Sequence, residues 1–511
     1  MFDILIKNAK IVDGSGSPWF YGNVAVKGEE IVGVGRVEGP ATRVIDAEGQ
    51  FLTPGFIDAH SHSDDSLLTN PLAESKTRQG VTAEVIGQCG SSAAPRKDAE
   101  GAYDYKSLAE YLDVLEKRGV ALNVIPLLGH GNLRQVVMGY DNRKATPLEL
   151  QQMCQLTADS MEAGAFGFTT GLIYPPGSYA DAEEITAIAK VVAEYGGIYA
   201  THMRDEDGNL LRSVAETIAV GKEASLPVHI SHHKVCGERN WGLVKESLKL
   251  IDEKRQQGVD ITMDQYPYIA TSTGLKVIIP QWAHAGGTAG LRARFTDAES
   301  RASLTQEILS AEKRWDWILV ASCSKEHNKI YEGKTAAEIA QMTGKAPVDA
   351  CLDLLLDEDF SVGMVRYAMC EEDVELVMQH PHVMIGSDSS ARATYGQLSE
   401  GKPHPRAYGT FTRVLETYVR ERNVLTLEDA VRKMTNLTAS RFQLWDRGLV
   451  RPGFKADLVL LDLAKCKENC TFAQPHAYPE GVSLVCVNGT IVVEAGEHLG
   501  LTPGKVLRMG R

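Results

Sequence analysis

Six residues of types that bind metal ions in proteins follow short apolar segments of this sequence. Two of them, His60 and His62, form a His-x-His pair directly after Phe56-Ile-Asp-Ala. Side chains of an extended chain alternate in direction, so both imidazoles of such a pair point to one side and can reach one ion. The other four residues are Cys89, His202, His232 and Asp388.

Zinc accepts imidazole nitrogen, thiolate sulfur and carboxylate oxygen together, so the six residues are chemically coherent as one or two adjacent Zn2+ sites. Each residue alone also has a structural explanation. Cys89 resembles a small buried hydrophobic residue, and His202 and His232 could be hydrogen-bonded core histidines. Asp388 could cap a following helix. The prediction of a metal site therefore depends on the occurrence of all six at corresponding positions.

These positions are the C-terminal ends of predicted parallel strands. The middle of the chain alternates strand-like apolar segments with longer helix-like segments, which is typical of repeated βα units in an α/β fold. Eight strands are predicted, as a TIM (β/α)8 barrel requires, at residues 56–60, 83–86, 123–127, 166–169, 198–202, 228–232, 261–264 and 383–388. TIM barrels build their active sites at this end of the strands.

The two ends of the chain differ from the middle, because both contain short strands separated by Gly-rich turns. We predict that residues 1–53 and 448–511 form one small β-sandwich domain, with the barrel, residues 54–447, inserted between them. A long stretch between the seventh and eighth strands, residues 281–346, is predicted to be an inserted subdomain that could act as a lid over the barrel mouth.

The composition is that of a folded soluble protein. Of the 511 residues, 43% are apolar and 23% are charged, and the formal net charge of −14 argues against a nucleic-acid-binding surface. No export signal is visible, and no apolar run approaches the ~20 residues that cross a bilayer. The nine cysteines are odd in number and scattered along the chain, which fits reduced thiols in a cytoplasmic enzyme better than disulfides. Cys466 and Cys470 are closely spaced, but no second pair of ligands accompanies them, so we do not expect them to form a metal site.

Several motifs, spaced in order along the chain, resemble those of the amidohydrolase superfamily. Thr53-Pro-Gly-Phe-Ile-Asp-Ala-His-Ser-His62 is similar to the opening signature of that superfamily. Four segments resemble its D-aminoacylase branch, the N-acyl-D-amino-acid deacylases: Thr201-His-Met-Arg-Asp-Glu206, Ser231-His-His-Lys234, Asp264-Gln-Tyr-Pro-Tyr268 and Gly386-Ser-Asp388. The resemblance runs almost from end to end and includes the split sandwich and the insertion.

The resemblance implies one tightly bound zinc ion held by Cys89, His202 and His232. It places His60 and His62 near a second, weaker or optional position, and it makes Asp388 the catalytic acid and base. In the related hydantoinases and dihydroorotases, a carboxylated lysine on the fourth strand usually bridges two metals. The fourth strand here, within residues 165–170, has no lysine, so Cys89 is the better bridging or tight-site ligand.

The implied substrate is a small molecule, an N-acyl-D-amino acid with a free carboxylate, which the enzyme would cleave to a carboxylate and a free D-amino acid. The resemblance assigns substrate binding to five residues near the barrel mouth: Arg406, Lys234, Tyr174, Tyr266 and Ser272. Arg406 suits a carboxylate because its planar guanidinium binds two oxygens at once.

The side-chain preference of the substrate depends on the loop 271–277, which contains apolar residues and Lys276. An inward-pointing Lys276 would favour acidic D-amino acids, and an outward-pointing one would favour apolar D-amino acids. We expect the apolar preference. His130, His229 and His233 are expected in the core or behind the metal ligands.

Two other functions remain open at this stage. The chain could be an amidohydrolase acting on a cyclic amide, a dipeptide-like conjugate or a carbamate, although Cys89, Lys234 and Arg406 weigh against this. It could also be a catalytically silent barrel, although the presence of every expected ligand and of Asp388 weighs against that. We expect no nucleic-acid or membrane partner, and the sequence leaves the oligomeric state undetermined.

Overall fold

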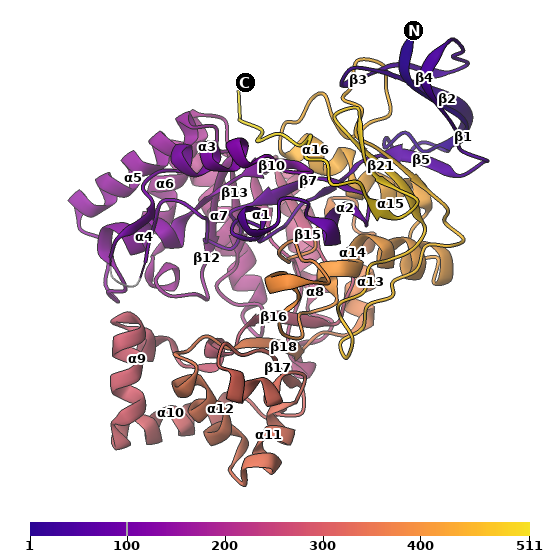
Figure 1. The fold of residues 1–511 in the computed structure, drawn as a ribbon. Helices are drawn as coiled ribbons and strands as arrows, with labels where there is room; N and C mark the ends of the chain where they lie inside the picture. The colour runs from indigo at the N-terminus through magenta and orange to yellow at the C-terminus, as the bar shows by residue number, and fades with distance from the viewer. Residues whose placement is uncertain (99–100, 511) are drawn as a thin grey trace.

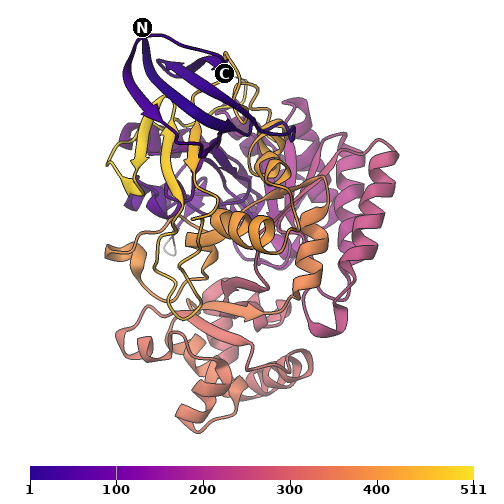
Figure 2. The ribbon, with the colours of Figure 1, turned by 90° about the vertical axis from the view of Figure 1, so that its right-hand side faces the viewer.

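A computed structural model describes residues 1–98 and 101–510 of the chain. The molecule has three parts: a barrel of parallel strands, a sheet built from both chain ends, and a subdomain at one end of the barrel (Figure 1). Both termini lie on the side of the molecule away from this subdomain (Figures 1 and 2).

Eight parallel strands form the barrel within the described residues. They are β6 (Phe56–Asp58), β7 (Val81–Ile86), β10 (Asn123–Pro126), β12 (Gly167–Gly171), β13 (Ile198–His202), β14 (Val228–Ile230), β15 (Ile261–Gln265) and β19 (Val383–Ile385). They pair in the orders β10-β7-β6 and β12-β13-β14-β15-β19, with the short β11 (Leu128–Gly129) beside β12. Backbone hydrogen bonds join the two sets, from Ala59 N to Ile385 O (3.2 Å) and from Phe166 N to Pro126 O (2.9 Å). The predicted (β/α)8 barrel is therefore confirmed.

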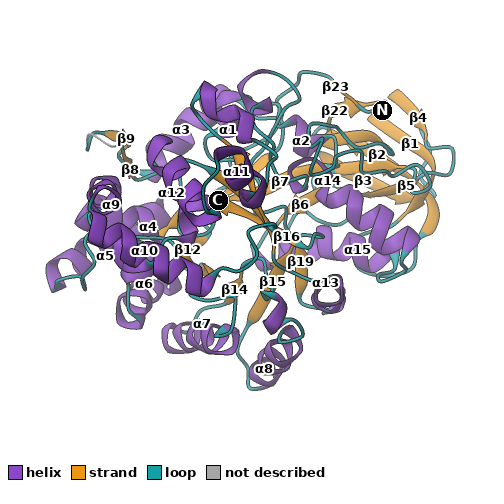
Figure 3. Cartoon of the chain, turned by 90° about the horizontal axis from the view of Figure 1, so that it is seen from below, coloured by secondary structure: helices purple, strands orange, loops and turns teal. Residues whose placement is uncertain are grey.

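Helices surround the barrel strands (Figure 3). They include α3 (Leu108–Arg118), α5 (Pro147–Glu162), α6 (Ala182–Glu194), α7 (Leu210–Ala224), α8 (Val244–Gln256), α13 (Glu371–Gln379), α14 (Arg406–Arg413) and α15 (Leu427–Met434). Thr146 and Glu149 start α5 with a reciprocal capping box that satisfies free backbone donors. Helix α6 buries Ile185, Ile188 and Val192, which share one face of the helix. No helix in the described part of the chain has the length and apolar content needed to cross a membrane.

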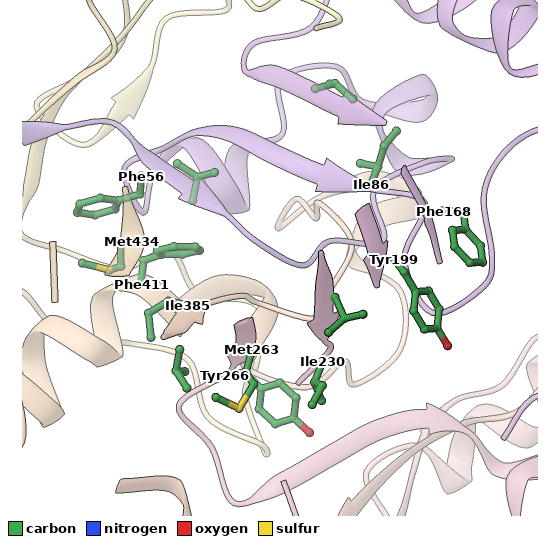
Figure 4. Packing of buried hydrophobic residues seen from close by; sticks show 14 of the residues in the cluster. Phe56, Ile86, Phe168, Tyr199, Ile230, Met263, Tyr266, Ile385, Phe411 and Met434 are labelled. Atoms are coloured by element: carbon green, nitrogen blue, oxygen red, sulfur yellow. The ribbon is translucent and has the colours of Figure 1, made fainter. Parts of the chain in front are cut away.

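Aromatic pairs fill the space between the barrel strands and their helices (Figure 4). Phe56 of β6 stacks on Phe411 of α14 with ring centroids 5.8 Å apart, and Phe168 stacks on Tyr199 at 4.8 Å. All four side chains are buried. Such pairs contribute about 0.5–1.5 kcal/mol beyond their burial of apolar area. The Phe56 pair therefore anchors the strand that leads directly to His60.

The chain leaves the barrel between β15 and β19 and forms a subdomain with its own apolar core, which includes Leu291, Leu304 and Leu355. Its elements are β16 (Ala270–Gly274), α9 (Gly287–Thr296), α10 (Ala298–Ala311), β17 (Ile318–Ser322), α11 (Ala336–Thr343), α12 (Pro347–Asp357) and β18 (Gly363–Tyr367). The predicted insert, residues 281–346, lies inside this longer excursion. Antiparallel pairing of β16 with β18 extends it on both sides, because these strands carry the chain out and back.

Strands from both chain ends form one nine-stranded sheet. They are β1 (Phe2–Ile11), β2 (Phe20–Lys27), β3 (Glu30–Gly35), β4 (Ala41–Asp46), β5 (Phe51–Pro54), β20 (Leu458–Leu461), β21 (Val482–Val487), β22 (Thr490–Glu494) and β23 (Glu497–His498). The two halves meet where β5 pairs antiparallel with β20 (Figure 2). The boundaries 1–53, 54–447 and 448–511 stay predictions, and residue 511 lies outside the described residues.

Candidate active site

The six predicted metal-binding and acid/base residues converge at the carboxyl ends of five barrel strands. They are His60 and His62 after β6, Cys89 after β7, His202 at the end of β13, His232 after β14, and Asp388 after β19. Their ligand atoms form two groups, in each of which the atoms lie within 4.8 Å of one another: Cys89, His202 and His232, and His60, His62, Cys89 and Asp388. The structure thus brings together all the residues that the sequence placed at the ends of strands.

Cys89 belongs to both groups. Its Sγ lies 3.3 Å from His60 Nε2 and 3.4 Å from His232 Nε2. Burial by itself raises the pKa of the Cys89 thiol, but the charges of His60 and His232 outweigh burial and hold this pKa well below its usual value. The thiolate is therefore favoured, and the thiolate is the form of cysteine that binds metal ions.

His202 provides a test of whether the first group fits a metal ion. Its imidazole is buried, and neither ring nitrogen makes a hydrogen bond to another described residue, although Glu206 Oε2 approaches Nε2 to 3.4 Å. Burial lowers the pKa of His202, which favours the neutral ring that binds metals. A buried polar atom without a partner is costly, and a metal ion would supply one. The sulfur and two nitrogens of this group suit zinc with one position left open.

Asp264, on β15, supports two of these residues from behind. Its Oδ2 lies 3.1 Å from His60 Nδ1 and 2.8 Å from His229 Nε2, and its Oδ1 accepts a hydrogen bond from His232 N (2.9 Å). Burial raises the pKa of Asp264, but His60 and His229 lower it further, so the carboxylate stays ionised. The contact to Nδ1 leaves the other nitrogen of His60 facing Cys89. His229 therefore lies behind the ligands, as expected.

Glu206 is a second supporting carboxylate, for which no role is predicted from the sequence. Its Oε1 lies 3.0 Å from His232 Nδ1, and its Oε2 lies 2.7 Å from Lys234 Nζ. A carboxylate on the far nitrogen of a metal-binding histidine fixes the orientation of the ring. The available signal was its position four residues after His202. Lys234, assigned to substrate binding by resemblance, is ion-paired with Glu206 in this structure.

Asp388 lies between the two histidines of the His-x-His pair and a guanidinium. Its Oδ1 is 3.1 Å from His62 Nε2 and 3.4 Å from His60 Nε2, and its Oδ2 is 2.8 Å from Arg406 Nη1. Burial raises the pKa of Asp388, but Arg406 and then His232 lower it more, to well below its usual value. An ionised carboxylate accepts hydrogen bonds and protons only, so the geometry is that of a base.

Three residues of the site have left-handed backbone conformations. Their φ angles are +53° at Cys89, +37° at His232 and +49° at Asp388. This region is uncommon for residues other than glycine, and each instance costs about 1–3 kcal/mol. The surrounding contacts must hold these three residues in place.

The predicted substrate-binding residues border the same site. The Arg406 side chain donates a hydrogen bond to the carbonyl of Ser272 (3.2 Å), and its guanidinium carbon lies 4.6 Å from the Tyr266 ring centroid. The Tyr174 ring lies 5.0 Å from the His202 ring, and its hydroxyl hydrogen-bonds to a threonine side chain of β16 (3.0 Å). Strand β16 of the subdomain therefore adjoins the site. The roles of these residues in substrate binding stay predictions.

Other residues singled out from the sequence have separate environments. The side chain of Lys276 is exposed just beyond β16 and makes no hydrogen bond or ion pair with another described residue. His130 Nε2 lies 2.7 Å from Glu184, and His233 Nε2 lies 2.8 Å from Ser247, so both histidines have structural partners. Cys466 and Cys470 belong to neither group of possible metal ligands found among the described residues.

Comparison with known proteins identifies similar sequences over nearly the whole chain. A sequence model of the amidohydrolase family matches residues 43–493. The D-aminoacylase of Alcaligenes xylosoxydans xylosoxydans is 35% identical, with 99% of this chain and 97% of that protein covered. The N-acyl-D-aspartate deacylase of the same organism is 36% identical, with coverage of 99% and 95%.

A solved structure has the same fold at similar coverage. The N-acyl-D-glutamate deacylase of Bordetella bronchiseptica, crystallised with zinc and a phosphonate mimic of the tetrahedral intermediate, superimposes with a TM-score of 0.85. It is 33% identical to this chain, and the match covers 99% of both chains.

Proposed function

Because the chain belongs to the amidohydrolase family, we propose that it is a metal-dependent deacylase of N-acyl-D-amino acids. It hydrolyses the amide bond to give a carboxylate and a free D-amino acid. The observation that carries the proposal is the convergence of Cys89, His202 and His232 next to Asp388 and Arg406. The preference for the D configuration is supported by the names of the relatives, two of which are deacylases of acidic N-acyl-D-amino acids.

Zinc is the proposed metal. Cys89, His202 and His232 would hold it tightly, and His60 and His62 would contribute to a second position. The donor chemistry and the unpartnered nitrogens of His202 support this assignment. When bound, zinc lowers the pKa of a coordinated water toward ~7 and polarises the scissile carbonyl.

Asp388 transfers the proton in the proposed mechanism. Its carboxylate takes one proton from the attacking water as the bond between water oxygen and carbonyl carbon forms. It then gives this proton to the amide nitrogen as the carbon–nitrogen bond breaks, since that nitrogen leaves as an amine. The ionised state of Asp388 supports the first step, and its position between His62 and Arg406, the proposed partner of the substrate carboxylate, supports the second.

Arg406 binds the α-carboxylate of the substrate in this proposal. Its guanidinium already pairs with one carboxylate, that of Asp388, at 2.8 Å. A substrate carboxylate would draw part of this charge away from Asp388 and so raise the pKa of Asp388 toward the range useful for proton transfer. Lys234, Tyr174, Tyr266 and Ser272 complete the proposed substrate-binding set.

Apolar D-amino acids are the proposed substrates. Leu275 is buried and Val277 is half-buried beside β16, whereas Lys276 is exposed. An inward turn of Lys276 would reverse this preference toward acidic side chains. Nine free thiols support a location in the reducing cytosol.

Purified, metal-replete protein should be assayed with N-acetyl-D- and N-acetyl-L- forms of methionine, leucine and glutamate, with zinc content measured on the same sample. We expect turnover of the D forms, fastest for the apolar ones, in protein that contains zinc. Equal rates for D and L forms would contradict the proposal. Inactivity toward all six, with turnover of a cyclic amide such as a hydantoin, would instead favour the alternative amidohydrolase function, and no turnover at all would favour a silent barrel.

A further inference from the structure

Lys76 is a wholly buried lysine beneath Asp388. It belongs to the short helix α2 (Glu74–Thr77), and its side chain has no solvent exposure. Its ammonium group donates to Asp58 Oδ2 (2.7 Å), to Ser387 Oγ (2.5 Å) and to Ser389 O (2.8 Å). An ammonium has three N–H donors, so all of them are used. Two of the three acceptors belong to the residues on either side of Asp388.

Asp58, the acceptor of one of these hydrogen bonds, is the last residue of β6, the strand that leads to the His-x-His pair. Its Oδ1 accepts hydrogen bonds from His60 N (3.2 Å) and from Ser387 N (2.8 Å). The pair of Lys76 and Asp58 therefore joins the end of β6 to the end of β19. These are the two strands that meet at one seam of the barrel.

The backbone of Asp388 requires such a support. Its φ of +49° lies in the left-handed region, which aspartate adopts more readily than most residues but still at a cost, so contacts must help to maintain it. Asp388 N donates to His60 O (2.8 Å), and Ser389 O accepts a hydrogen bond from His62 N (3.2 Å) besides the one from Lys76. The conformation that turns the carboxylate of Asp388 toward His62 is thus fixed from both neighbouring residues.

A second buried carboxylate reinforces this network. Glu84 lies 3.8 Å from Lys76 Nζ and accepts hydrogen bonds from Ser61 Oγ (2.6 Å) and Ser63 Oγ (2.8 Å). Ser63 Oγ in turn accepts from Ala391 N (2.8 Å). The network therefore connects the segment around His60 to the segment around Asp388, directly through the bond from Ala391 N to Ser63 and indirectly through Lys76 and Asp58.

We propose that Lys76 is a positioning residue for Asp388, whose ammonium fixes residues 387 and 389 so that the carboxylate faces the reaction. The proposal rests on the proposed function, in which Asp388 transfers the proton. It goes beyond that function because Lys76 touches neither the metal ligands nor the place for the substrate. Misplacement of a reacting group by about 1 Å can cost about 100-fold in rate.

The variant Lys76→Met tests this, with Lys433→Met as a matched control. Lys433 is also wholly buried, but its ammonium donates to His380 O (2.5 Å) and Val383 O (3.4 Å), at the opposite end of β19. We expect kcat of Lys76→Met to fall about 100-fold with KM changed less than about threefold and zinc content unchanged. Lys433→Met should keep kcat within about threefold of wild type, whatever its effect on thermal stability.

Unchanged kcat in folded Lys76→Met, or equal losses of kcat in both variants, would overturn the proposal. If Lys76→Met does not fold, the variant Ser387→Ala provides the test, because it removes one acceptor of the Lys76 ammonium. We expect its kcat to fall about tenfold. A kcat of Ser387→Ala equal to that of wild type would overturn the proposal. Crystal structures of wild type and Lys76→Met test the positioning of Asp388 independently of the proposed function, because they show the backbone conformation of Asp388 directly. Should wild type prove inactive on N-acyl-D-amino acids, loss of the positive φ at Asp388 in Lys76→Met would still support positioning, and its retention would overturn it.

Discussion

At the residue scale, the site depends on side chains whose protonation is set by their neighbours. Cys89 is poised as a thiolate between two imidazoles, and Asp388 is poised as a carboxylate against Arg406. His202, by contrast, is kept neutral by burial. These three states are those required of a thiolate ligand, a proton acceptor and an imidazole ligand, respectively.

Asp388→Asn should remove proton transfer without removing the metal. The amide of asparagine has nearly the same shape as the carboxylate of aspartate, but it does not take up a proton near neutral pH. We therefore expect kcat to fall by about 10²–10⁴-fold. Zinc content should stay unchanged, because the three proposed tight ligands are elsewhere. Steady-state kinetics with metal analysis checks this, and a kcat within tenfold of wild type would remove Asp388 from its assigned role.

Cys89→Ala should lower zinc occupancy, because it removes the one sulfur donor shared by both groups of ligands. Cys486→Ala is the control, since Cys486 is also a buried free thiol but lies in β21 of the terminal sheet. Metal analysis after dialysis at a fixed zinc concentration measures the difference. Full occupancy in Cys89→Ala would mean that Cys89 is an ordinary core residue.

At the scale of elements, the loop after β13 joins the site to the subdomain. It carries Glu206 toward His232 and Asp207 toward Arg366 of β18. Asp207 Oδ1 is buried without a hydrogen-bond partner among the described residues, and burial raises the pKa of Asp207 from 3.8 to about 6. This loop therefore holds one carboxylate with ion-pair partners, that of Glu206, and one with a buried oxygen that lacks a hydrogen-bond partner among the described residues, that of Asp207.

Asp207→Asn should stabilise the protein at neutral pH. The raised pKa means that the folded state binds a proton more tightly than the unfolded state, so the stability linked to Asp207 is present below about pH 4 and lost as pH rises through 6. We expect a gain of about 1–3 kcal/mol at pH 7.5 that shrinks toward pH 4.5. Thermal unfolding at both pH values measures it; a gain independent of pH would contradict this origin.

Much of the barrel could be predicted from the sequence because its signals are local. Alternating apolar segments mark each strand, and the ligands follow the strand ends directly, as His202 does at the end of β13. The supporting residues could not be predicted in the same way. Asp264 lies 204 positions from His60, and Lys76 lies 311 positions from Ser387, so their roles exist only after the barrel has closed. Left-handed φ angles at Cys89 and Asp388 also leave no sequence signal.

At the scale of the whole molecule, metal binding should stabilise the barrel, because its ligands come from four separate strands. Removal of metal with a chelator should lower the Tm, and added zinc should restore it. At a zinc concentration a thousand times Kd, binding should raise the free energy of unfolding by up to about 4 kcal/mol. Differential scanning calorimetry of wild type and Cys89→Ala checks this. An equal response of both proteins to the chelator would contradict the assignment of Cys89.

The sheet shared by the two chain ends has a consequence for synthesis of the protein. Strand β5 pairs with β20, about 400 residues further along the chain. At 5–20 residues per second, roughly 20–80 seconds pass between translation of these two strands. During this interval the nascent chain presents β5 with an unpaired edge, directly before the first strand of the barrel. The ribosome-bound chain therefore exposes this edge to misassociation and to chaperones until β20 has been synthesised.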